Sequence, residues 1–191
     1  MTFGDLIKGL PYPALAGAES SARHSDIECE VIGLFEEFRN PLLRYVASFG
    51  IPMHDAEEVI QEVFLSLFLH LHSNGSRRNL RGWIFRVAHN QALKRRQANQ
   101  RMSRMAVSDG LDVANQADLS PNPEQRYSLI QKQIRILSVV DALPETDRRC
   151  LFLRAEGLRY RDIATILGIS LGSVSISLSR SIARLVRAEG S

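Results

Sequence analysis

Hydrophobic residues recur at intervals of three and four along most of the chain, which is the spacing of one face of an α-helix. The pattern predicts one helix over residues 26–49, where Pro41 is expected to kink or split it. Further helices are predicted over residues 55–71 and from about residue 80 toward residue 100. No segment alternates polar and apolar residues over a convincing length, so we predict an all-α protein.

Short local signals mark where these helices begin and end. Gly50 and Pro52 are expected to end the first helix. Asp55, followed three residues later by Glu58, resembles a capping box and is expected to start the second helix. The polar residues 72–79 are then expected to form a loop before the third helix.

Two stretches lack helical periodicity and divide the chain. Residues 1–25 are rich in Gly, Pro, Ala and Ser, which is typical of a mobile extension. Residues 102–123 gather Ser, Asp, Asn, Gly and Pro, which is typical of a flexible linker. We therefore predict two small helical domains, over residues 26–101 and 124–191. The second domain carries four shorter helical patterns, over residues 124–142, 145–156, 160–167 and 171–188.

Residues 160–185 have the spacing of a helix-turn-helix. Gly168 can adopt the left-handed conformation that ends the first of its helices, and Ser170 can cap the second. On the second helix an apolar stripe is expected to face inward, while hydroxyls and arginines face outward, as a helix in a DNA major groove requires. The candidate duplex-binding residues are Ser170, Ser173, Ser175, Ile176, Ser177, Arg180 and Arg184.

Two alternatives stay open for this motif. It could be an ordinary amphipathic helical hairpin whose polar face is simply solvated. Ile176 is apolar although the helical period turns it outward, so it either touches a thymine methyl or packs on a partner.

The charge distribution adds a second candidate site. The formal charge of +3 and the pI near 9.1 permit a nucleic-acid partner without requiring one. Residues 26–62 hold nine acids, whereas residues 77–104 hold nine Arg or Lys and no acid. In the third helix these cations alternate with aromatic and amide side chains, a composition that suits single-stranded DNA. The candidates are Arg77, Arg78, Trp83, Arg86, Asn90 and Lys94. Alternatively, Trp83 and Phe85 belong to the core and the cations are only solvated.

The second helix has a polar side that could dock a basic partner. Its latter half is apolar nearly all round, which indicates a helix that is buried or bound by a partner. The candidate docking residues are Asp55, Glu58, Gln61, Glu62 and Leu65. A solvated acidic face is the alternative.

Several classes of protein find no support in the sequence. Cys29 and Cys150 have no companions at disulfide or zinc-site spacing, so both thiols are expected to be buried and inert. No apolar run reaches membrane-spanning length, and we expect a cytoplasmic protein without membrane insertion. No P-loop, dinucleotide-binding turn or Cys/His cluster is present, so we expect no catalytic residue, metal or cofactor. The scattered histidines are expected to be solvated: His54, His70, His72 and His89.

Three stretches in this order resemble the extracytoplasmic-function (ECF) sigma factors of the sigma-70 superfamily: residues 55–65, residues 80–90, and residues 143–149 with the helix-turn-helix that follows. The resemblance implies that the first stretch docks on the clamp helices of the polymerase beta-prime subunit. The second would open the strands and bind the minus-10 element, with the loop 72–79 capturing a flipped base. The third would bind minus-35 duplex.

The same resemblance implies further partners: core RNA polymerase, including its beta flap, promoter DNA, and an anti-sigma factor. Two departures affect the DNA-binding surfaces. Ser175 and Ser177 stand where the family often has Lys and Arg, and Lys94 stands where many members have an acid. Each lost phosphate contact weakens binding to DNA. A sigma-like decoy that binds an anti-sigma protein and a stand-alone helix-turn-helix regulator therefore remain as alternatives.

Overall fold

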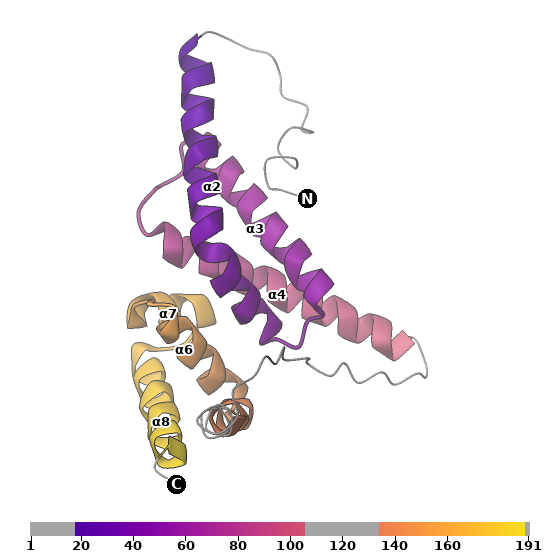
Figure 1. Cartoon of the computed structure of the whole chain (residues 1–191), viewed down its shortest axis with the longest axis vertical. Helices are drawn as coiled ribbons and strands as arrows, with labels where there is room; N and C mark the ends of the chain where they lie inside the picture. Colours follow the sequence, from indigo (N-terminus) through magenta and orange to yellow (C-terminus); the bar gives the residue numbers. More distant parts are fainter. Residues whose placement is uncertain (1–17, 106–133, 190–191) are drawn as a thin grey trace, which may run out of the picture. The chain divides into compact units, whose positions relative to one another are not determined.

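The computed structural model describes residues 18–105 and 134–189, and every regular element in these two ranges is a helix (Figure 1). The all-α prediction is confirmed for this part of the chain. Residues 134–141 are helical, and the remaining helices are α2 (Ala18–Ala47), α3 (Met53–His72), α4 (Leu80–Met105), α6 (Glu145–Ala155), α7 (Tyr160–Leu167) and α8 (Leu171–Glu189). The chain forms two compact units that divide between Gln100 and Arg101.

The first unit is built around aromatic rings. Helices α2 and α3 lie side by side, and α4 packs against them (Figure 1). The Tyr45 and Phe85 rings meet edge to face at 5.8 Å, and Phe38 contacts Phe85 at 6.3 Å. The Tyr45 hydroxyl shares a 2.8 Å hydrogen bond with Nδ1 of His89, which is only 5% exposed. The prediction that His89 is solvated is therefore wrong, because the ring completes this core and has a buried polar partner.

The helices of this unit extend beyond their apolar stripes. Helix α2 begins at Ala18, although a helix was predicted only from residue 26, and it continues through Pro41 without splitting. The hydrophobic pattern missed its first turns because Ile27 is the first described residue of α2 that is buried. Helix α4 runs to Met105, so residues 102–105 of the predicted linker are helical.

The predicted cap of the second helix is wrong. Helix α3 begins at Met53 with Pro52 at its N-cap position, and no side chain caps it. Asp55 instead lies in the first turn, where its charge complements the positive end of the helix dipole. Its carboxylate is engaged by α4, as described below.

Residues 73–79 connect α3 to α4 through a closely fixed loop. Asn74 and Asn79 both have positive φ angles, of 56° and 55°, which asparagine tolerates better than most residues. Nε2 of His70 donates to the carbonyl of Ser76 at 3.1 Å. A side chain on Gly75 would collide with the His70 ring and its carbonyl, so the close approach requires glycine there. The loop geometry is thus specified by local contacts.

The second unit contains the predicted helix-turn-helix. Helix α7 has the bounds expected from the sequence and ends at Gly168, whose φ of 65° is left-handed. The backbone N–H of Ser173 donates to Oγ of Ser170 at 3.1 Å, which confirms the predicted cap of α8. The chain bends by 106° between α7 and α8, within the usual range for this motif. A small aliphatic core fills the unit, formed by Leu143, Leu153, Leu158, Ile163, Ile166, Val174 and Leu178.

Cys150 is buried as predicted, but Cys29 is exposed, because it lies on the outer side of α2. No single helix in the described ranges is long and apolar enough to cross a membrane, although α7 and α8 together pass that test by length and composition despite the bend between them.

Candidate nucleic-acid interface and docking surface

An exposed polar stripe runs along α4. Arg86, Asn90 and Lys94 are all exposed and follow one another at four-residue spacing, which places them on one side of the helix. Ala88 and Ala92 are fully buried on the opposite side. The structure therefore brings three of the single-strand candidates together on an open surface.

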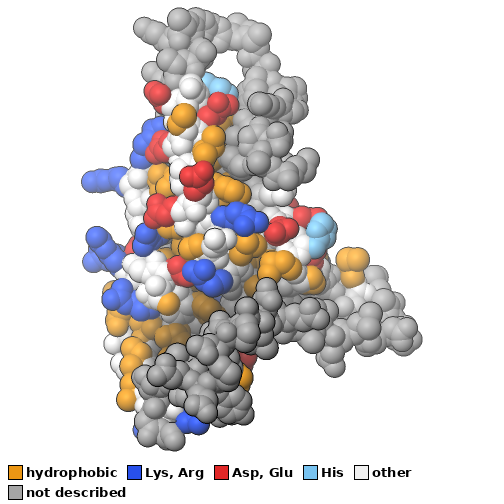
Figure 2. All heavy atoms as spheres, in the orientation of Figure 1, with side chains coloured by type: hydrophobic (Ala, Val, Ile, Leu, Met, Phe, Trp, Pro, Cys, Tyr) orange, Lys and Arg blue, Asp and Glu red, His pale blue; other side chains and the backbone are white. Residues whose placement is uncertain are grey.

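Other cations near this stripe are already paired with acids of α2. Arg77 donates from Nε to Glu30 at 3.0 Å, and Arg81 donates from Nη2 to Glu37 at 3.0 Å. Arg81 also lies over the Phe38 ring, 5.1 Å from its centroid. Figure 2 shows the result on one face of this unit, where Lys and Arg side chains alternate with acidic ones. Of the two loop candidates, Arg77 is thus ion-paired, whereas Arg78 has an exposed side chain.

The two aromatic candidates of α4 have different environments. Phe85 is fully buried, so the alternative that placed it in the core is right. Trp83 is half-buried and stacks on His70, with the ring centroids 4.8 Å apart and the planes at 25°. Sequence analysis missed this role of His70 and expected it to be solvated. Its position in the last turn of α3, just before the loop, was the available signal.

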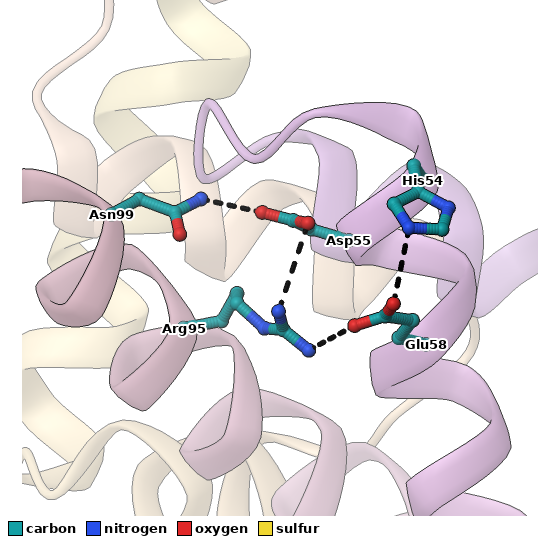
Figure 3. A network of polar contacts seen from close by, with 5 residues as sticks. All are labelled: His54, Asp55, Glu58, Arg95 and Asn99. Carbon is teal, nitrogen blue, oxygen red and sulfur yellow. Dashed lines mark hydrogen bonds and ion pairs between the residues drawn. The ribbon is translucent and has the colours of Figure 1, made fainter. Parts of the chain in front are cut away.

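The acids at the start of α3 are bound by α4 (Figure 3). Asn99 donates from Nδ2 to Asp55 at 2.6 Å, and Nη1 of Arg95 lies 3.7 Å from the same carboxylate. Nη2 of Arg95 donates to Glu58, whose other oxygen lies 3.1 Å from Nε2 of His54. These two acids are therefore neither simply solvated nor fully open to a partner.

The rest of the candidate docking surface is accessible. Gln61 and Glu62 are exposed, Leu65 is half-buried, and Leu69 is 52% exposed. Their spacing places them on one side of α3. The polar residues Gln61 and Glu62 are followed on that side by the apolar residues Leu65 and Leu69. This is the open part of the predicted surface.

On α8 the structure separates the duplex-binding candidates into groups. Ser173, Ser175 and Arg184 are exposed, and Ile176 is 63% exposed. Ile176 thus points outward, as the helical period predicted. Ser170 acts as the helix cap, and its hydroxyl also lies 2.9 Å from that of Ser173.

The prediction that Ser177 faces outward is wrong. Its side chain is only 5% exposed and hydrogen-bonds to Asp147 of α6. Ser181, one turn later, is fully buried and donates to the carbonyl of Ser177 at 2.8 Å. Small hydroxyl residues let α6 approach this side of α8 closely, so the buried side is wider than its apolar stripe. A residue held in this way is not available to DNA.

Asp147 is the most buried acidic side chain in the described part of the chain, and it binds Arg180. Arg180 donates from Nε to Oδ2 at 2.9 Å and from Nη2 to Oδ1 at 2.8 Å. The Asp147 side chain is 1% exposed, whereas that of Arg180 is 52% exposed. Sequence analysis did not single out Asp147, because nothing in its local pattern indicates a partner more than thirty residues away.

The surroundings of Asp147 determine its protonation. Burial raises the pKa of this carboxyl, but hydrogen bonds from Arg180 and Ser177 and the charges of Arg180 and Arg184 outweigh burial and lower the pKa below its ordinary value. Burial raises the pKa of the neighbouring Cys150 thiol, and the charge of Asp147 adds to that effect. The site therefore holds a carboxylate at neutral pH.

No three metal-binding side chains come together in the described residues.

Comparisons with known proteins agree with these two units. Residues 34–102 match the family model for sigma-70 region 2, and residues 133–185 match that for sigma-70 region 4. The chain is similar to the ECF RNA polymerase sigma factor SigE of Mycolicibacterium smegmatis, with 31% identity over 128 residues that make up 66% of this chain and 49% of that protein. This chain thus spans about half the length of that relative.

Two further relatives match over more of their length. RNA polymerase sigma factor CnrH of Cupriavidus metallidurans is 28% identical over 75% of this chain and 78% of its own. Among solved structures, the sigma factor RpoE in complex with the anti-sigma factor NepR from Bartonella quintana matches with a TM-score of 0.57 and 19% identity, over 82% of this chain and 96% of that one. At that identity the structural likeness supports the fold alone.

Proposed function

This chain belongs to the ECF group of the sigma-70 family, and from that premise we propose that it carries core RNA polymerase to specific promoters through a division of labour between its two domains. The first domain, residues 26–101, binds core polymerase and the opened minus-10 element. The second domain, residues 124–191, binds minus-35 duplex. The match of each domain to a different sigma-70 region, in the family's order, is the observation that carries this proposal.

Melted minus-10 DNA binds along α4 in this proposal. Arg86 and Lys94 neutralise phosphates, while Asn90 between them offers an amide to unpaired bases. Trp83 supplies a ring for stacking, and His70 supports it from one side. The adjoining loop with Arg78 captures one flipped base. Arg77 assists only if its ion pair with Glu30 opens.

Core polymerase docks on α3. The exposed residues Gln61, Glu62, Leu65 and Leu69 offer an acidic and apolar strip to the beta-prime clamp helices. Asp55 and Glu58 join this surface through the carboxylate edges that Arg95 leaves accessible, since Glu58 is 41% exposed. The second domain reaches the beta flap, and an anti-sigma factor regulates access to either surface.

Minus-35 duplex binds the exposed side of α8. Ser173 and Ser175 offer hydroxyls, Ile176 offers apolar contact to a thymine methyl, and Arg180 and Arg184 offer cations. Ser170 contributes chiefly by capping α8. The N-terminus of α8 that it caps favours a phosphate, because the positive end of the helix dipole lies there. Members of the family are DNA-binding regulators, and we propose that this chain likewise performs no chemistry, needs no cofactor and acts in the cytoplasm with the polymerase.

Reconstituted transcription tests the proposal. The full chain is mixed with core polymerase and a promoter library, and specific transcripts are expected. The substitution Asn90→Ala should reduce promoter opening about tenfold while leaving core binding unchanged. Promoter opening is measured by the permanganate reactivity of unpaired thymines. Asn40→Ala, which removes an exposed asparagine from α2, serves as the matched control.

Other outcomes would favour the alternatives. Specific duplex binding without polymerase would indicate a stand-alone regulator. Binding to an anti-sigma protein with no transcript from any promoter would indicate a decoy. Equal loss of core binding and opening in Asn90→Ala would remove α4 from its proposed role.

A further inference from the structure

Asp147 has the geometry of a residue that orients another side chain. It lies in the first turn of α6, while Arg180 lies on α8, so their contact joins two helices. The carboxylate binds the edge of the guanidinium formed by Nε and Nη2, at 2.9 and 2.8 Å. Ser177 adds a third hydrogen bond to the same carboxylate. Two parallel hydrogen bonds on a planar group fix the plane as well as the position of Arg180.

The contact leaves the other edge of the guanidinium available. A guanidinium has a side edge, Nε with Nη2, and an end edge, Nη1 with the second N–H of Nη2. Asp147 occupies the side edge, so the end edge points away from it. The Arg180 side chain is 52% exposed, whereas that of Asp147 is 1% exposed. The free edge is therefore directed toward solvent on the side of α8 that also carries Ile176.

We propose that Asp147 is a positioning residue that holds Arg180 so that its end edge binds O6 and N7 of one guanine in minus-35 duplex. This inference rests on the proposed function, because it deepens the role of α8 in that function. Two acceptors on the major-groove edge of guanine match the two donors of the end edge. Asp147 itself touches no DNA.

Fixed orientation favours a base over a phosphate as the ligand. Phosphate oxygens accept hydrogen bonds from many directions, so a freely rotating cation serves them well. We assign that phosphate role to Arg184, which is exposed one turn farther along α8. A guanidinium held in one plane gains instead from a planar acceptor pair, because little side-chain freedom remains to be lost on binding.

The first experiment measures base preference in the holoenzyme. The full chain with core polymerase is tested on promoters whose minus-35 element is randomised at each position in turn. The unaltered protein is expected to prefer guanine at one position. Asp147→Asn should lower that preference by roughly fivefold to a hundredfold and leave the other positions unchanged. Glu145→Gln is the matched control, because this acid lies in the same turn of α6 and forms an ion pair with Arg149 of that helix, at 2.5 Å.

A second experiment tests the guanine contact first in the unaltered protein. Replacing the preferred guanine with 7-deazaguanine removes the N7 acceptor, and the unaltered holoenzyme should then lose most of its preference. Asp147→Asn should be nearly indifferent to that replacement. Arg180→Lys, which keeps the charge but loses the paired donors, should reproduce the loss of preference. The 7-deazaguanine and Arg180→Lys arms test the contact of Arg180 with guanine even if Asp147→Asn folds poorly, whereas the positioning role is tested by Asp147→Asn.

Three results would overturn the inference. A variant that melts at lower temperature but keeps its guanine preference would make the contact a brace between helices only. A uniform loss of affinity at every position, with a weaker dependence on salt, would make Arg180 a phosphate contact. No transcription by the unaltered protein with core polymerase would refute the proposed function itself, whereas the first two results leave that function intact.

Discussion

The two units join their helices by different means. The first relies on large rings that interlock across three helices, with Tyr45, Phe64, Phe68 and Phe85 fully buried. The described core of the second contains no buried aromatic ring: it is mainly aliphatic, with Cys150 and two serines beside it, and it includes one carboxylate that is almost completely enclosed, Asp147. Interlocking rings specify how helices cross through shape alone. A core of small aliphatic residues specifies less, so a directional polar contact has more influence on the relative placement of α6 and α8.

The same contrast appears in how the units use ion pairs. Arg95 joins α3 to α4 where the side chains of Asp55 and Glu58 are 19% and 41% exposed. Water screens such contacts, and exposed pairs contribute little to stability. Asp147 is screened less, because its side chain is only 1% exposed, and losing its partner would leave a buried charge without solvation. Similar chemistry therefore has different consequences in the two units, and substitutions can measure the difference.

The largest effect is expected at Asp147. Asp147→Asn should destabilise the second unit by roughly 2 kcal/mol, because it removes a charge-assisted, bidentate contact from an enclosed site. Circular dichroism during urea unfolding would show the shift. Trp83 is the only tryptophan of the chain and belongs to the first unit, so its fluorescence reports the unfolding of that unit. The urea midpoint of this fluorescence transition should stay unchanged. A parallel shift of both signals would contradict the expectation that the two units unfold separately.

A smaller effect is expected in the aromatic core. Tyr45→Phe keeps the ring but leaves His89 without the hydroxyl at 2.8 Å, which should cost about 1 kcal/mol. Here the Trp83 fluorescence transition should shift to lower urea. Tyr160→Phe, which removes an exposed hydroxyl from α7, is the control and should be neutral. A loss equal to that of Asp147→Asn would show that both units depend on buried polar contacts.

The smallest effect is expected at Arg95. Arg95→Ala should lower the free energy of unfolding of the first unit by about 0.5 kcal/mol at low ionic strength, and about 1 M salt should abolish the difference. Gln97→Ala, at an exposed position of the same helix within the first unit, provides the control. A loss that persists in high salt would mean that the α3 and α4 network contributes through packing.

Local signals made much of this architecture predictable. Helix α7 has its predicted bounds because Gly168 and Ser170 act within a few residues of themselves. Ser177 was misplaced because serine carries no hydrophobic signal, so a helical period cannot distinguish a buried hydroxyl from a solvated one. The role of Asp147 depends on how α6 and α8 cross, and no pattern within either helix encodes that crossing. The same holds for the pairing of Asp55 with Asn99.

The loop between α3 and α4 has an energetic consequence for the proposed opening of promoter DNA, which would proceed without nucleotide hydrolysis. His70, Gly75 and Asn79 already hold its backbone in place through contacts that need no ligand. Capturing a flipped base there would spend little conformational entropy on ordering the loop. Most of the binding free energy of that base would then remain available to keep the two DNA strands from annealing again.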